Sequence, residues 1–244
     1  MRKQTKLVDC GSTVFIYDYK DRSDIKNLHF ERKNPVGELT HLKRLVLTNF
    51  VDDRPLATFA LRMPLANYET AEFRIRSFIN KLKNSSGHSS VKYLAVAELP
   101  KVEQDATVKI HLMTDLEFSS LTSTVNGFIA NEEEYFSNLW GDCVNIEIFP
   151  QEILLSIIDH AYCQSLMSSH YTSLTKIVFK SRLKKPNILW NEEADAFIKM
   201  KNVFDFPYHF GEEMFDKVGG FVNVNVFSLY DTSFFTKELK SRIS

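Results

Sequence analysis

The sequence predicts an α+β fold with a central antiparallel sheet of about five strands and flanking helices. Short runs rich in β-branched and aromatic residues recur along the chain, and amphipathic helical patterns lie between them. Two of the runs follow each other closely enough to pair as antiparallel neighbours. With 44% hydrophobic and 13% aromatic residues among 244, the chain can bury a substantial core. This composition excludes an intrinsically disordered chain.

The first half of the chain contains two expected strands and two expected helices. Residues 13–19 (TVFIYDY) are aromatic and β-branched, which is typical of a strand, and a charged loop follows in residues 20–37. Leucine and valine recur at helical spacing in residues 38–49, and residues 56–62 (LATFALR) form a short buried strand. The clearest helix is residues 68–83, whose apolar side chains fall on one stripe.

The second half begins with the two runs that we expect to pair. These are residues 91–98 (VKYLAVAE) and 108–114 (VKIHLMT), separated by a polar loop. The remaining expected elements are a helix at 132–139, a strand at 144–149, a helix at 150–164, a strand at 176–180, a helix at 191–201 and a strand at 220–230. Their order predicts an α+β sheet with helices packed on one face.

Charge and cysteine content limit the classes of function. The 30 Lys and Arg residues against 31 Asp and Glu give a net charge of -1, so any nucleic-acid contact must come from a local patch. The cysteines Cys10, Cys143 and Cys163 show no CxxC spacing, which predicts reduced, buried thiols rather than disulfides or a zinc site. No apolar run approaches the ~20 residues of a membrane span. We therefore expect a cytoplasmic protein that does not contact membranes.

A candidate site lies on the two paired strands. Alternate residues of a strand share a face, so Lys109 and His111 lie together while the intervening residues of 108–114 face the core. Glu98 ends the preceding strand and is expected across from them, within salt-bridge reach of the Lys109 ammonium. Carboxylate and imidazole groups are ligands that Mn²⁺ or Mg²⁺ accepts. A single Glu and a single His also meet by chance in many proteins, so a structural role is the alternative.

A series of sequence blocks gives this site a wider context. In order they are VFIYDY, FERKN, LATFALRMPLANYETAEFRIRSFINKLK, VKYLAVAELPK, VKIHLMTDL, LWGDCVNIEIF, KIVFKSRLKKPNILW and GFVNVNVFSLY. In this order the chain resembles the rolling-circle replication initiators of Gram-positive plasmids and phages, members of the HUH endonuclease superfamily. The resemblance covers roughly residues 13–230. It implies an HUH-type domain in residues 1–186 and a C-terminal extension, residues 187–244, packed on it.

The family resemblance implies a metal-dependent nicking reaction. Two histidines flanking one hydrophobic residue, with an acid on the neighbouring strand, hold a divalent cation that polarises the scissile phosphate. A tyrosine on a later helix then attacks, leaving a 5′-phosphotyrosine and a 3′-OH that primes replication. Here Glu98 matches the acid and His111 the second histidine, but Lys109 stands at the first histidine position. An ammonium group has no lone pair for a metal.

The nucleophile also departs from the family pattern. The family has a Tyr-x-x-Lys segment on this helix, whereas this chain reads LLSIIDHAYCQS. Alignment back from SRLKKP places Ile157 or Ile158 near the nucleophile position, and only a shifted register brings in Tyr162. Tyr171, in the following polar loop, fits less well. Together the two departures predict a vestigial metal site and no cofactor; Mn or Mg would be needed if the site is active.

A basic run follows this helix. Its cations are Lys176, Lys180, Arg182, Lys184 and Lys185, with no acid between them. Ser181 could add a hydroxyl contact to a phosphate. The resemblance places the run beside a DNA-binding face, and the alternative is a solvated edge.

These observations predict a replication-initiator-like DNA-binding protein of plasmid or phage origin that has lost nicking activity. Such a protein would regulate replication initiation or compete with it. Its expected partners are single-stranded or origin-hairpin DNA, and a second copy of the chain or an active initiator. One alternative is an active HUH nickase that uses Glu98, His111 and a third ligand, with Tyr162 as nucleophile. Another is a protein-interaction module on a decayed HUH fold.

Overall fold

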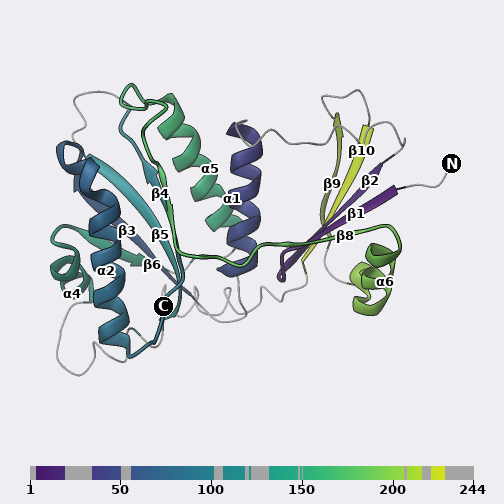
Figure 1. The fold of residues 1–244 in the computed structure, drawn as a ribbon, viewed down its shortest axis with the longest axis horizontal. Helices are drawn as coiled ribbons and strands as arrows, with labels where there is room; N and C mark the ends of the chain where they lie inside the picture. Colours follow the sequence, from purple (N-terminus) through teal and green to yellow (C-terminus); the bar gives the residue numbers. More distant parts are fainter. Residues whose placement is uncertain are drawn as a thin grey trace, which may run out of the picture. The chain divides into compact units, whose positions relative to one another are not determined.

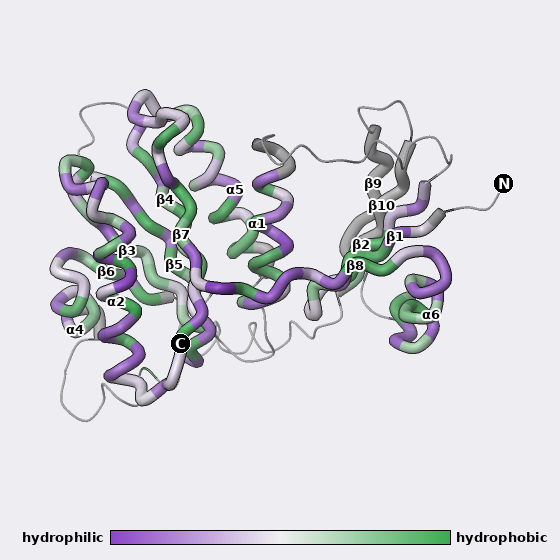
Figure 2. Tube along the Cα trace, in the orientation of Figure 1, coloured by the Kyte–Doolittle hydropathy of each residue, from purple (hydrophilic) through white to green (hydrophobic). Residues whose placement is uncertain are grey.

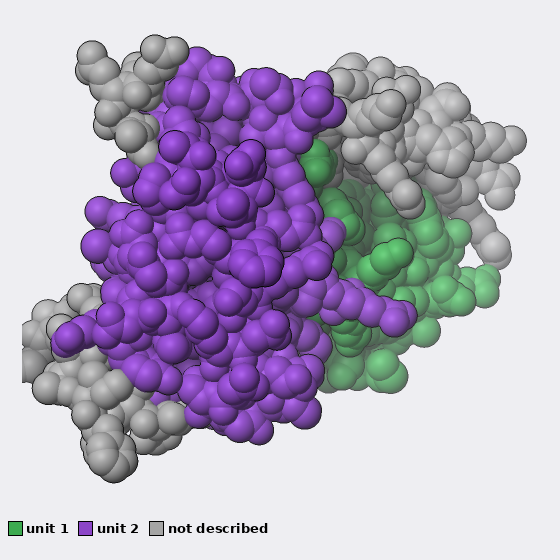
Figure 3. All heavy atoms as spheres, turned by 60° about the vertical axis from the view of Figure 1, so that its left-hand side comes forward, with its two compact units in different colours: residues 1–53, 184–234 green, residues 54–183, 235–244 purple. Residues whose placement is uncertain are grey.

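The computed structural model has an α+β architecture in which the chain forms two compact units (Figure 1). Unit 1 comprises residues 1–53 and 184–234, and unit 2 comprises residues 54–183 and 235–244 (Figure 3). The structure describes residues 4–19, 35–50, 56–101, 107–118, 121, 132–147, 149, 151–205, 208–215 and 221–228. The charged segment 20–34, which includes the FERKN block, lies outside these ranges.

Unit 1 contains a five-stranded antiparallel sheet in the order β8-β1-β2-β10-β9. Its strands are β1 (Gln4–Asp9), β2 (Thr13–Tyr19), β8 (Asn187–Trp190), β9 (Tyr208–Phe215) and β10 (Phe221–Ser228). Its helices are α1 (Pro35–Asn49), α6 (Glu192–Lys201) and the short 3₁₀ helix η3 (Val203–Asp205). The sheet is therefore completed by strands from both ends of the chain.

Helix α6 forms the core of unit 1 with one face of this sheet. The buried cluster consists of Leu7, Val14, Ile16, Ala194, Val203 and Phe227. Three acids in the first turn of α6 and two lysines in its last turn complement the helix dipole. Asn202 ends the helix in the left-handed conformation, at φ 47°.

Unit 2 contains a second five-stranded antiparallel sheet, in the order β6-β3-β5-β4-β7. Its strands are β3 (Leu56–Pro64), β4 (Tyr93–Glu98), β5 (Thr107–Glu117), β6 (Val144–Glu147) and β7 (Val178–Lys180). Its helices are the 3₁₀ helix η2 (Leu65–Thr70), α2 (Ala71–Ser86), α4 (Glu132–Trp140) and α5 (Gln151–Met167). The central strand β4 is almost entirely apolar, as expected of a strand buried on both faces, and most residues of its neighbour β5 are buried too (Figure 2).

Helices cover both faces of the unit 2 sheet, whereas the sequence predicted helices on one face only. Phe59 of β3 contacts Phe78 of α2 and Phe136 of α4, with ring centroids 5.4 Å apart in each pair. Helix α5 packs against β4 on the opposite side (Figure 1). Because of this second layer, His111 and Met113 are buried as well as the alternate residues of β5 that were expected in the core.

The α+β class and the antiparallel pairing of β4 with β5 are confirmed. The structure has two sheets where one central sheet was expected, and β1, β8 and β9 were not predicted. The compact units alternate along the chain, with boundaries after residues 53, 183 and 234, so residues 1–53 group with residues 184–234 and not with the rest of 1–186. Among the described residues, no helix has the length and apolar character needed to cross a membrane.

The cysteines occupy two kinds of environment. All three are free thiols, as predicted. Cys10 is buried, and burial raises the pKa of its thiol to about 11. The expected burial is wrong for Cys143 and Cys163, which are exposed. Cys143 lies in the short segment between α4 and β6, and Cys163 lies on an exposed side of α5.

Candidate functional site

The register of β4 and β5 brings three candidate residues to one face of the unit 2 sheet. Glu98 lies directly opposite Lys109, and Val96 lies opposite His111. Directly opposed residues share a face, as do residues two apart on one strand. Glu98, Lys109 and His111 therefore share the face on which α5 packs, as the sequence predicted.

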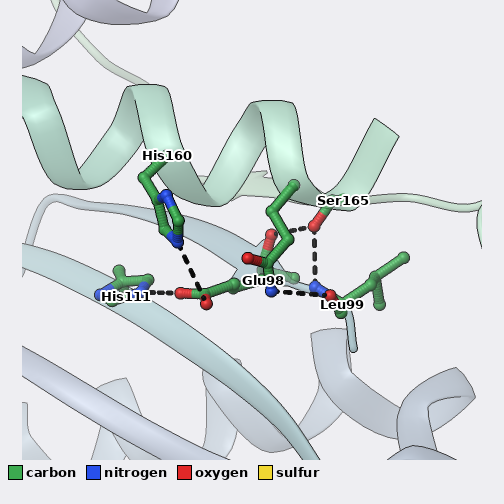
Figure 4. Close-up of polar contacts among 7 residues, drawn as sticks. Glu98, Leu99, His111, His160 and Ser165 are labelled. Carbon is green, nitrogen blue, oxygen red and sulfur yellow. Dashed lines mark hydrogen bonds and ion pairs between the residues drawn. The ribbon is translucent and has the colours of Figure 1, made fainter. Parts of the chain in front are cut away.

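Glu98 and His111 form a close pair on this face (Figure 4). The His111 Nε2 group donates a hydrogen bond of 2.9 Å to Oε2 of Glu98. The two side chains are largely buried, with exposed fractions of 8% for His111 and 17% for Glu98. The hydrogen bond from His111 lowers the pKa of Glu98, partial burial opposes that shift, and the nearby charges of His111, Lys109 and His160 add to it.

The sequence-based prediction of a Glu98–Lys109 salt bridge is wrong. Among the described residues, the ion pairs of Glu98 are with two histidines, His111 and His160. Lys109 is close enough for its charge to lower the pKa of Glu98. The hydrogen bond to the buried His111 occupies one carboxylate oxygen and leaves the ammonium of Lys109 as a longer-range neighbour.

His160 is a member of the site that the sequence analysis did not identify. It projects from α5 toward Glu98, and its Nε2 lies 3.7 Å from Oε1 of Glu98 (Figure 4). Its side chain is 63% exposed, so it forms the outer edge of the cluster. A histidine on the helix expected to carry the nucleophile was the available signal. The rotation of that helix about its axis cannot be read from its sequence, because apolar residues occur all around it.

Hydrogen bonds between α5 and β4 fix His160 over the sheet. Ser165 is fully buried; its Oγ donates to the carbonyl of Ala97 at 2.7 Å and accepts from the amide of Leu99 at 2.8 Å. Ser168 at the end of the helix donates to the carbonyl of Pro100 at 2.5 Å. The contacts span the end of β4, so the helix is held beside Glu98 (Figure 4).

The nucleophile candidates are not presented to solvent beside this cluster. Tyr162 is only 2% exposed. Residues two apart on a helix point about 200° apart, so Tyr162 and His160 lie on different sides of α5. Ile158 is fully buried, Ile157 is partly buried, and neither carries a nucleophilic group. Tyr171 is partly buried in the segment after α5.

Glu98, His111 and His160 are all residue types that bind metals, but their arrangement does not fit the cation that the resemblance implies. In the parts of the chain that the structure describes, no group of three or more His, Cys, Asp or Glu side chains could hold a metal ion. Lys109 adds a positive charge to the same face, which repels a cation.

The basic run begins with a lysine that already has partners. The Nζ of Lys176 lies 2.5 Å from Oε2 of Glu72 and 5.3 Å from the ring centroid of Phe179. Tyr68 donates a hydrogen bond to the Lys176 carbonyl. Ser181 also has a structural role, because its Oγ accepts from the amide of Tyr93 at 2.9 Å. These contacts fix the first part of the run, from Lys176 to Ser181, to the rest of unit 2.

The remaining cations of the run are exposed but belong to different units. Lys180 and Arg182 lie in unit 2, whereas Lys184 and Lys185 lie in unit 1. The Asn49 side chain accepts from the Lys184 amide and donates to its carbonyl, both at 2.9 Å. The backbone at Lys184 is thus fixed while its side chain is free to reach solvent.

Comparisons of the chain with known proteins found no match. No protein-family model, curated protein or solved structure matches the chain. The resemblance to rolling-circle initiators therefore stays a prediction from the sequence. The geometry of the Glu98 cluster and the exposed cations has to support any functional proposal by itself.

Proposed function

We propose that this chain is a replication-initiator-like DNA-binding protein of plasmid or phage origin that does not nick DNA. It would act in the cytoplasm, without a metal cofactor, by regulating replication initiation or competing with an active initiator. The observation that carries the proposal is the placement of Glu98, Lys109 and His111 on one face of an antiparallel pair, beneath a helix. That placement follows the pattern of the resemblance, with lysine replacing one ligand.

Two features argue against cleavage on this site. The carboxylate of Glu98 is hydrogen-bonded to His111, and Lys109 supplies a positive charge where the reaction would need a metal. The tyrosine of α5, Tyr162, is buried and cannot approach a phosphate without moving the helix. Nicking requires both the cation and the nucleophile, so the loss of either is sufficient to prevent it.

DNA binding is supported by the exposed part of the basic run. Lys180, Arg182, Lys184 and Lys185 are exposed, and none forms an ion pair with another described residue. In a chain with a net charge of -1, unpaired cations this close in sequence form a local attraction for phosphates. Each phosphate contact releases condensed counterions and makes binding depend on salt.

The binding experiment measures fluorescence anisotropy of a labelled single-stranded 30-mer at several salt concentrations. Affinity should fall with salt, with a log–log slope of about -0.7 per phosphate contact. The double variant Lys184→Ala/Lys185→Ala should flatten this slope by about 1.4 if both residues contact phosphates. Its matched control is Lys199→Ala/Lys201→Ala, which removes the same charge from exposed positions on α6. Absent binding, or binding independent of salt, would contradict the proposal and favour the protein-interaction module.

His160 favours one second candidate, the active nickase. It brings a second imidazole beside Glu98, and the active nickase requires such a third ligand. An assay on supercoiled and single-stranded DNA with Mg²⁺ or Mn²⁺ separates the two functions. We expect neither cleavage nor a covalent adduct. An adduct that disappears in Tyr162→Phe, a variant that keeps the buried ring, would establish the nickase instead.

A further inference from the structure

The face of the unit 1 sheet opposite α6 has an unusual composition. Leu7, Val14 and Ile16 point toward α6, so the alternate residues of β1 and β2 point to the other face. On this other face, the strands β8, β1 and β2 carry Trp190, Lys6, Phe15, Tyr17 and Tyr19, which we call the aromatic-basic face. Helix α1 covers part of this face: Arg44 lies over Phe15 and Tyr17, and Val8 and Tyr19 are buried. Lys6 and Trp190 are partly exposed, so these two side chains form the accessible part of the face.

Lys6 lies at the centre of this face. It is the direct cross-strand partner of Tyr17 on one side and of Trp190 on the other. Its Nζ lies 5.7 Å from the ring centroid of Tyr17 and 5.3 Å from that of Trp190. Tyr19 stacks on Trp190 at a centroid distance of 6.2 Å and an interplanar angle of 23°. The lysine is thus held between two rings by cation–π contacts.

A second cation comes from helix α1. The guanidinium of Arg44 lies 5.7 Å from the ring centroid of Phe15 and 5.6 Å from that of Tyr17, and it donates to the Tyr17 hydroxyl. Burial and the charge of Arg44 lower the pKa of Lys6 to about 8. Among the described residues, neither cation pairs with a carboxylate. Two like charges held together without a counterion favour the binding of an anion.

The end of β8 is fixed in place beside Lys6. Asn191 follows Trp190 with φ 47° and ψ -113°, a backbone conformation that is strained for a residue with a side chain. Its amide donates to the Thr5 carbonyl at 2.8 Å, and its Oδ1 accepts from the Thr5 amide at 3.3 Å. These bonds hold Trp190 in register with β1, while Ile188, two residues earlier on the same face, is 48% exposed.

We propose that the aromatic-basic face binds single-stranded nucleic acid, with bases stacking beside Trp190 and phosphates drawn to Lys6 and Arg44. Aromatic rings interleaved with cations on a sheet are suited to single strands, because every base has a face that stacks and every linkage carries a charge. Duplex DNA hides its bases and should bind more weakly. The inference rests on the proposed function only in assuming that the chain binds DNA, and it adds a base-contacting surface on unit 1.

The test uses tryptophan emission, because stacking on a base quenches it. The chain has two tryptophans, and Trp140 is 5% exposed with its indole N–H donating to the Arg62 carbonyl. A dT 12-mer should quench the full-length protein, whereas Trp190→Phe, which keeps Trp140, should lose the quenching. In Trp190→Ala, affinity for the 12-mer should fall about 5- to 150-fold, the range for one lost stacking contact.

Two controls separate stacking from charge. An abasic 12-mer keeps the phosphates but should not quench, and Lys6→Gln should weaken binding of both oligonucleotides. Lys199→Gln, on the exposed side of α6, should leave both unchanged. This inference would be overturned if anisotropy showed binding of the 12-mer without quenching of Trp190 emission, and if Trp190→Ala bound with the affinity of the parent. That result would leave the proposed function intact. Quenching that persists in Lys184→Ala/Lys185→Ala at unchanged affinity would overturn the role of the basic run instead. No binding of either oligonucleotide would overturn both.

Discussion

Lys109 sets the charge of the face on which Glu98 and His111 meet. Because it lies opposite Glu98 and two residues from His111, a side chain at this position points at the same space as both groups. Replacing an ammonium with an imidazole there removes the repulsion of cations and adds a lone pair. One side chain, that of Lys109, therefore decides whether this face repels or accepts a cation.

We therefore expect Lys109→His to create Mn²⁺ affinity that the parent protein lacks. Titration calorimetry at neutral pH should show heat of binding for the variant and none for the parent. Lys109→Gln, which removes the charge without adding an imidazole, is the matched control and should bind far more weakly than Lys109→His. Equal binding by the parent would mean that His160 already completes a metal site. Metal binding by the variant would not by itself produce nicking, because Tyr162 stays buried.

Lys6 gives unit 1 a defined dependence on pH. Its pKa is lowered from 10.5 to about 8, so between these values the unfolded chain holds a proton that the folded protein has released. Lys6 should therefore add stability as the pH increases from 8 to 10.5, and the destabilisation by its buried charge should be fully present below pH 8. Above pH 9 the raised pKa of Cys10 acts in the opposite direction, because the folded protein keeps a thiol proton that the unfolded chain loses. Urea unfolding at several pH values should show the Lys6 contribution as a rise in the stability of the parent relative to that of Lys6→Met. Lys199→Met, at an exposed position, should keep it.

The residues of the site were predictable to different degrees. The shared face of Glu98, Lys109 and His111 followed from the period of two along a strand and from antiparallel pairing, both local properties. His160 depends on how α5 is rotated and where it docks, which the Ser165 and Ser168 hydrogen bonds decide. Such contacts join residues more than sixty positions apart, so no local sequence pattern predicts them.

At the scale of elements, the docking of α5 depends on one buried hydroxyl. Ser165→Ala would leave the amide of Leu99 without its acceptor inside the protein. Loss of a buried hydrogen-bond partner costs about 1–3 kcal/mol. Chemical denaturation should show a decrease of this size in the free energy of unfolding. Ser156→Ala, at an exposed position of the same helix, should change stability by less than about 0.5 kcal/mol. Similar effects of the two variants would show that the α5 contact contributes little.

The elements that escaped prediction are strands with weak local signals. Strand β8 has only four residues, β1 mixes charged and apolar residues, and β9 reads YHFGEEMF, with a glycine and two acids inside it. Strands β1 and β8 pair with each other although they are far apart in sequence, whereas β9 pairs with β10, the next strand along the chain. Strands with strong alternation or apolar runs, such as β2, β4 and β5, were predicted because their own residues specify them.

At the scale of the whole molecule, the division into two units predicts how two fragments of the chain fold. Residues 54–183 contain all the described strands and helices of unit 2, so this fragment should fold cooperatively. Residues 1–183 add β1 and β2 without β8 or β10, and a lone two-stranded ribbon is marginally stable in water. Circular dichroism and urea unfolding should show one transition of similar free energy in both fragments. A second folded unit in residues 1–183 would contradict this division of the chain.

The interleaved order of the units also has a consequence during synthesis on the ribosome. Residues 1–53 are made first, but the strands that flank β1 and β2 are encoded after residue 183. At translation rates of about 5–20 residues per second, the 130 residues from 54 to 183 take roughly 7–26 s to make. During that interval Phe15, Tyr17 and Tyr19 have no completed sheet to join. The nascent N-terminus is therefore the segment most in need of a chaperone, while unit 2 can fold ahead of it.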